Sequence, residues 1–154
     1  MTDTLVRRLA AAGLVCAVVA TGACHHRAAP APLAPAGPSL YQRLGGHDAV
    51  ALVVEDFVSR VGADARINAF FRGVDLAELK HLLGEQICQA AGGPCRYSGR
   101  PMRVAHQGLH IRDADFDALV EDLTAALGHF NVPDREQHEL LGALGGMRRD
   151  IVGR

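Results

Sequence analysis

One histidine stands in a local sequence that is well suited to hold a metal. His106 lies between Pro101 and Gly108 in the segment GRPMRVAHQGLHI, residues 99–111. Proline fits the first turn of a helix, where its missing N–H costs nothing, and glycine readily takes the left-handed conformation that ends a helix. The spacing predicts a short helix with His106 in its last turn and one ring nitrogen near a free carbonyl. A neutral imidazole held in this way is a good ligand for haem iron, although a lone histidine is more often a core or surface residue.

Four stretches with apolar residues at helical spacing predict the helices that would position this histidine. Asp75 and Glu78 match the pattern of a capping box for the second helix, and Pro133 can start the fourth. The sequence therefore predicts an all-α domain. The apolar stripes are Val50, Val53, Val54, Phe57 and Val61; Leu76, Leu79, Leu83 and Ile87; Phe116, Leu119, Val120, Leu123 and Leu127; and Leu140, Leu144, Met147 and Ile151.

Five blocks of the sequence occur together in a characteristic order. They are SLYQRLGG (39–46), VVEDFVSRV (53–61), NAFFRGVDLAELK (68–80), QAAGGPCRYSG (89–99) and PMRVAHQGL (101–109). In this order and at these distances the chain resembles the group 1 truncated haemoglobins over residues 39–154. The resemblance implies one truncated globin domain, folded as a two-over-two helical sandwich around a b-type haem.

The resemblance also assigns roles to individual residues. His106 falls on the family's proximal haem ligand, and Phe71 falls on the phenylalanine that packs against the haem face. Met102, one helical turn before His106, is placed in the haem pocket as well. The pairs Gly45–Gly46 and Gly92–Gly93 fall on the glycine motifs that shorten the family's helical sandwich.

The chain departs from the family on the gas-binding side of the haem. Val58 stands where the family commonly has a tyrosine, and Leu83 stands where a glutamine is often found. With Leu79 and Ile87 these residues would make the distal wall apolar. Each hydrogen bond lost from bound O2 forfeits about 0.5–1.5 kcal/mol, a few-fold to tenfold in affinity. We therefore expect a pocket that binds O2, NO and CO with a reduced preference for O2.

Two polar residues near this wall could change that expectation. His81 is two residues from both Leu79 and Leu83, so on a helix it points about 200° away from them and favours a solvated role over a second iron ligand. Gln86, one helical turn after Leu83, could instead turn inward and supply a substitute donor. The candidates to pair with the haem propionates are Lys80, Arg100 and Arg103.

The N-terminal segment has the layout of a secretory signal peptide over residues 1–23. Arg7 and Arg8 precede an apolar run from Leu9 to Ala20, which is shorter than the ~20 apolar residues of a membrane-spanning helix. The following T-G-A-C junction resembles a bacterial lipobox, which makes Cys24 a candidate lipid-attachment site. Thr21 replaces the usual leucine, so ordinary cleavage nearby and an uncleaved anchor stay open as alternatives.

Residues 24–38 are rich in alanine and proline, a composition that favours extended conformations and cannot bury a core. We interpret this segment as a tether between the membrane and the globin domain. The sequence thus predicts an exported, membrane-anchored lipoprotein that faces the periplasm or the cell exterior.

The four cysteines agree with this organisation. Cys16 would leave with the signal peptide and Cys24 would carry lipid, so Cys88 and Cys95 would be the pair in the domain, in an oxidising compartment. They flank the turn at 92–94 and could form a disulfide worth roughly 2–3 kcal/mol on the chain-entropy model. Two free buried thiols are the alternative.

Charge and motifs exclude several other functions. The formal net charge is −1 and no basic stripe is present, which gives no case for nucleic-acid binding. The glycine pairs lack the spacing of phosphate-binding loops. The expected function is reversible gas binding rather than catalysis. One alternative is a haem enzyme, a nitric oxide dioxygenase or a peroxidase-like protein, that depends on an external electron donor. The other is a helical lipoprotein that binds a partner without haem.

Overall fold

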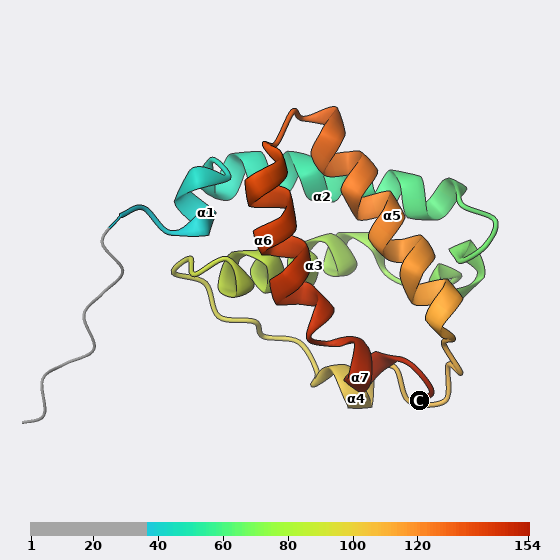
Figure 1. Ribbon diagram of the computed structural model, residues 1–154. Coiled ribbons are helices and arrows are strands. Elements are labelled where there is room, and N and C mark those ends of the chain that lie inside the picture. Colours follow the sequence, from blue (N-terminus) through green and yellow to red (C-terminus); the bar gives the residue numbers. More distant parts are fainter. Residues whose placement is uncertain (1–36) are drawn as a thin grey trace, which may run out of the picture. The chain divides into compact units, whose positions relative to one another are not determined.

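The computed structural model describes residues 37–154, which are helical with no strand in this range (Figure 1). The predicted signal peptide, Cys24 and most of the tether lie outside the described residues. The all-α fold class is confirmed. The elements are α1 (Leu40–Arg43), α2 (Gly46–Ala63), the 3-10 helix η1 (Asn68–Phe71), α3 (Leu76–Ala90), α4 (Met102–Ala105), α5 (Asp113–His129), α6 (Asp134–Gly145) and α7 (Arg148–Ile151).

The four long helices form two layers. In Figure 1, α5 and α6 cross over α2 and α3, and α2 packs against both α3 and α5 while α3 packs against α6. The apolar stripes meet between these layers because each helix turns its apolar face inward. The largest fully buried side chains come from four different segments and mark the core; they are Ile67, Cys88, Leu127 and Leu140.

The start of α3 shows how the sequence sets a helix end. The Asp75 carboxylate accepts hydrogen bonds from the backbone N–H groups of Ala77 (2.9 Å) and Glu78 (3.2 Å), which satisfies two of the donors that a helix leaves free in its first turn. The predicted capping box is only half present in the described hydrogen bonds, because the exposed Glu78 side chain does not return to the backbone of Asp75.

The fourth predicted helix is broken into two. The apolar spacing predicted one helix that carries both Leu144 and Ile151, but α6 ends at Gly145 and α7 begins at Arg148. The prediction was wrong here because Gly145 and Gly146 are adjacent, and each glycine costs about 1 kcal/mol in a helix interior. The break leaves Met147 in the link between α6 and α7.

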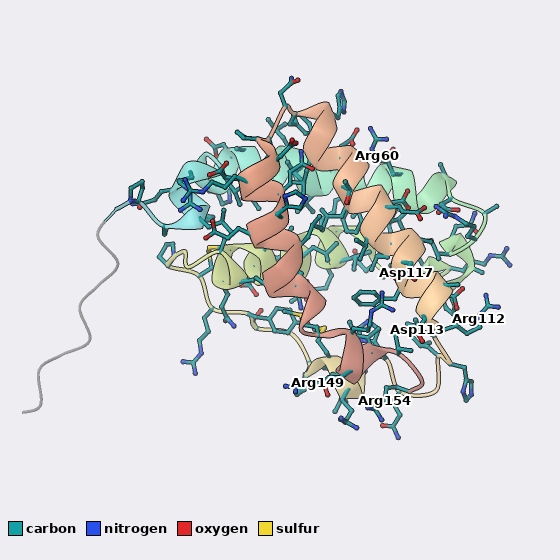
Figure 2. All side chains as sticks on the ribbon, in the orientation of Figure 1. Arg60, Arg112, Asp113, Asp117, Arg149 and Arg154 are labelled. Carbon is teal, nitrogen blue, oxygen red and sulfur yellow. A yellow bond between two sulfur atoms is a disulfide. The ribbon has the colours of Figure 1, made fainter. Side chains whose placement is uncertain are left out.

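Helix α7 is fastened to the body of the domain at both ends. The Arg148 guanidinium donates to the carboxylates of Asp113 and Asp117, which lie on the part of α5 that faces α7 (Figure 2). After the helix, the His110 N–H donates to the Arg154 carbonyl at 2.8 Å. The segment that follows α4 is therefore held in place by the last residues of the chain.

Candidate functional site

A cavity of about 670 Å³ lies among these helices, within the 300–1,000 Å³ typical of cofactor sites. Its walls are mostly apolar. They include Phe57, Val58 and Val61 of α2, Phe70 and Phe71 of η1, Leu79, Leu82, Leu83, Gln86 and Ile87 of α3, Met102 and Ala105 of α4, Phe116, Leu119, Val120 and Leu123 of α5, and Leu141, Leu144, Met147 and Ile151 near the C-terminus.

His106 also lines this cavity and is half-buried, at the residue that directly follows α4. Its Nδ1 atom lies 2.7 Å from the Met102 carbonyl oxygen, a freed acceptor of the short helix. Because a carbonyl only accepts hydrogen bonds, Nδ1 is the donor in this contact, and in the neutral tautomer that this contact selects Nε2 keeps its lone pair. Pro101 stands just before the helix rather than inside its first turn, and Gly108 takes a φ of +80° beyond it.

A single imidazole nitrogen in an apolar cavity suits haem iron better than a bare metal ion. A bare ion needs several protein ligands, and residues 37–154 contain no cluster of three or more histidine, cysteine or carboxylate side chains placed to hold one. Haem supplies in-plane nitrogen ligands of its own, so one axial imidazole is enough. The residues present therefore fit a haem group.

The residues that the sequence assigned to the pocket come together around this one cavity. The buried side chain of Val58 reaches it from α2, and half-buried side chains reach it from η1, α3 and α4. Val58 and Leu83, which stand where the family commonly has a tyrosine and a glutamine, carry no hydrogen-bond donor on their side chains. The predicted haem-contacting and distal-wall residues that line the cavity are Val58, Phe71, Leu79, Leu83, Ile87, Met102 and His106.

The two polar residues near this wall differ in where they point. His81 is exposed, outside the cavity lining, and its Nε2 lies 3.4 Å from the Glu85 carboxylate. Gln86 does line the cavity, but its amide nitrogen contacts the sulfur atoms of Met102 (3.3 Å) and Met147 (3.0 Å). Sequence reasoning missed the Met147 contact because it placed this residue within a continuous helix.

The three candidate partners of the haem propionates differ in whether a carboxylate of the protein already pairs with them. Lys80 pairs with Glu55 at 2.6 Å and Arg103 pairs with Asp150 at 2.9 Å. Arg100 lines the cavity, is exposed, and has no carboxylate partner among the described ion pairs. Of the three, Arg100 is the cation best placed to meet a carboxylate at the edge of the cavity.

A loop fixed to α3 carries Arg100. Cys88 and Cys95, which the sequence left open between a disulfide and free thiols, are joined by a disulfide in the structure, with their Cα atoms 5.7 Å apart. Further along the loop, Ser98 donates to the Glu85 carboxylate through its backbone N–H (2.8 Å) and its hydroxyl (2.7 Å). These two donors hold the pKa of Glu85 below its usual value. Residues 97–100 thereby form a wall of the cavity.

Comparison with known proteins places this architecture in a family. Residues 39–152 match the family model described as bacterial-like globin. The chain is 39% identical over 114 residues to the group 1 truncated hemoglobin GlbN of Mycolicibacterium paratuberculosis. This alignment covers 74% of this chain and 84% of the relative. It is 38% identical to the group 1 truncated hemoglobin GlbN of Synechocystis, in an alignment that covers 74% of this chain and 97% of that relative.

Solved structures agree with these matches. The truncated hemoglobin of Tetrahymena pyriformis in its Fe(III) form superposes with a TM-score of 0.74 at 31% identity, over 76% of this chain and all of that one. The 2/2 hemoglobin of Synechococcus, a structure with covalently attached heme, gives a TM-score of 0.72 at 38% identity over the same shares of the two chains. The chain belongs to the globins, as a group 1 truncated haemoglobin.

Proposed function

We propose that this globin holds a b-type haem through Nε2 of His106 and binds diatomic gases reversibly. The observation that carries the proposal is the 2.7 Å contact between His106 Nδ1 and the Met102 carbonyl, which leaves the other ring nitrogen free at an apolar cavity. When bound, haem would supply an iron that takes O2, NO or CO as a ligand. The protein would supply the imidazole ligand and a mostly apolar pocket.

The side chains around the cavity define what the protein adds to this chemistry. Val58 and Leu83 offer no hydrogen bond to a gas molecule, so the pocket discriminates less in favour of O2, whose bound form gains most from a donor. Arg100 offers its guanidinium to a propionate carboxylate, a charge-assisted contact. We propose that the chain fixes haem from these two directions, through His106 and at the cavity edge.

A haem titration tests the proposal. The purified protein, freed of haem, is titrated with hemin, and the absorbance should show a Soret band that saturates at one haem per chain. Reduction with dithionite followed by CO should then shift the band and bind CO stoichiometrically. A titration without saturation would reject the proposal and favour the alternative of a haem-free interaction module.

The enzyme alternatives receive less support from the cavity. A peroxidase-like reaction needs positioned acid–base groups beside the reacting ligand. The wall formed by Val58, Leu79 and Leu83 carries none. A nitric oxide dioxygenase would in addition require an electron donor from outside the described domain. Gas binding without turnover therefore remains the function that the site supports best.

We also propose that the domain works outside the cytoplasm, anchored through a lipid on Cys24. The signal-like N-terminus supports this proposal, and so does the Cys88–Cys95 disulfide, because structural disulfides persist in oxidising compartments. None of the helices in residues 37–154 is long and apolar enough to span a bilayer.

Mass spectrometry of the protein purified from its native membrane fraction should show a mature chain that begins at Cys24 with added acyl mass. Cys24→Ser should release the protein from the membrane fraction. An intact Met1 terminus in the cytoplasmic fraction would contradict both export and anchoring.

A further inference from the structure

Gln86 is a polar side chain that projects into a mostly apolar cavity and contacts only weak acceptors. The half-buried side chain lies on α3, and its amide nitrogen contacts the Met102 sulfur at 3.3 Å and the Met147 sulfur at 3.0 Å. Thioether sulfur accepts hydrogen bonds only weakly, but an amide with no partner in an apolar cavity costs more. The amide therefore favours the arrangement in which both sulfur atoms stay beside it.

The two methionines belong to the segments that carry and support the histidine. Met102 is the first residue of α4, and its carbonyl accepts the His106 ring proton at 2.7 Å. Met147 directly precedes α7, which packs against α4 and is bonded to it through Arg103 and Asp150 at 2.9 Å. Gln86 thus reaches both members of the α4–α7 pair.

Helix α7 is bonded to α5 through Arg148, but the α4–α7 pair makes few contacts with α3. None of the four residues of α4 is buried, and α7 buries only Ile151. Among the described side-chain hydrogen bonds, those that run from α3 to α4 or to Met147 come from Gln86 alone. The disulfide and Ser98 hold the loop before α4 to α3, and the Gln86 amide is the described side-chain contact that links α3 to Met102 itself.

We propose that Gln86 is a positioning residue for the axial histidine. Its amide contacts both sulfur atoms and so fixes the start of α4 and the link before α7. Because the Met102 carbonyl accepts the His106 ring proton, fixing Met102 also fixes the orientation of the ring. The inference rests on the proposed function, because it takes His106 as the iron ligand. It also assigns Gln86 to the histidine side of the haem rather than to the gas-binding side.

The test compares three variants. They are Gln86→Leu, the double variant Met102→Leu/Met147→Leu, and the triple variant that combines all three substitutions. Leucine replaces methionine with little change in volume, so the double variant removes the acceptors and leaves the cavity filled. Gln107→Leu, at an exposed glutamine beside His106, is the matched control. For each holoprotein we would measure the iron–histidine stretching band of the ferrous form by resonance Raman spectroscopy and the rate of haem transfer to apomyoglobin.

Gln86→Leu should keep one haem per chain, shift or broaden the iron–histidine band, and speed haem loss about 2- to 3-fold, the lower end of the range for a hydrogen bond because thioether sulfur is a weak acceptor. The double variant should reproduce this result, and the triple variant should add nothing further. An unchanged band in Gln86→Leu, or effects that add in the triple variant, would overturn the inference. Failure of the iron-ligand assignment is a separate result, because it would appear as normal haem binding in His106→Ala.

Discussion

Replacing His106 with alanine is expected to lower haem affinity by at least about 100-fold and to abolish stoichiometric uptake. The estimate is a lower bound, because even the outer partners of a metal ligand are typically worth 10- to 100-fold. His106 places an imidazole at the cavity, and residues 37–154 contain no cluster of alternative metal ligands. Hemin titration followed by the Soret spectrum measures the loss.

Two controls separate loss of the ligand from loss of the fold. His110→Ala, at an exposed histidine four residues further on, should bind haem normally. Free imidazole added to the His106→Ala protein should restore part of the spectrum, because it can enter the space that the side chain leaves. If His106→Ala retains normal haem content and an unchanged spectrum, then another residue holds the iron.

The double variant Val58→Tyr/Leu83→Gln is expected to slow O2 dissociation from the ferrous protein by about 5- to 150-fold. Two new hydrogen bonds at 0.5–1.5 kcal/mol each give this range. Dissociation of CO should slow far less, because bound CO carries less negative charge and gains less from a donor. Both wild-type side chains line the cavity, and Val58 is 6% exposed, so the new groups should reach the ligand. Stopped-flow rates for the two gases decide the matter.

The matched control is Val58→Phe/Leu83→Met, which adds similar bulk without a donor. It separates hydrogen bonding from crowding, since overpacking alone costs typically 1–3 kcal/mol. We expect it to change the O2 and CO rates in parallel. If the wild-type protein already holds O2 as tightly as the Tyr/Gln variant, a donor such as ordered water is present and the apolar-pocket proposal is wrong.

Features of the fold that depend on neighbouring residues could be predicted from the sequence. The apolar stripes predicted the long helices, and the Pro101–Gly108 spacing predicted the contact between the His106 ring and a freed carbonyl. The extent of the last helix could not be obtained in the same way. Apolar spacing continued through Gly145–Gly146, and only the competition between helix propensity and tertiary contacts decides where such a helix ends.

Contacts between segments far apart in the chain were harder to foresee. The sequence placed Gln86 one turn after Leu83 and so raised the possibility of a donor to bound gas. The structure places its amide on Met102 and Met147, the second of which is 61 residues away. Similarly, nothing local distinguished Arg100 from Arg103. The two arginines differ because Arg103 forms an ion pair with Asp150 of α7 and Arg100 does not.

The acceptor of the His106 ring proton also has an electronic consequence. The Met102 oxygen is a neutral carbonyl, whereas a carboxylate in that place would draw the proton away and raise the basicity of the ring. A ring with this partner would donate less electron density through Nε2 than a ring held by a carboxylate. Strong donation from an axial ligand favours cleavage of the O–O bond, as thiolate ligands show. We therefore expect the setting of His106 to favour reversible ligand binding over cleavage of the O–O bond.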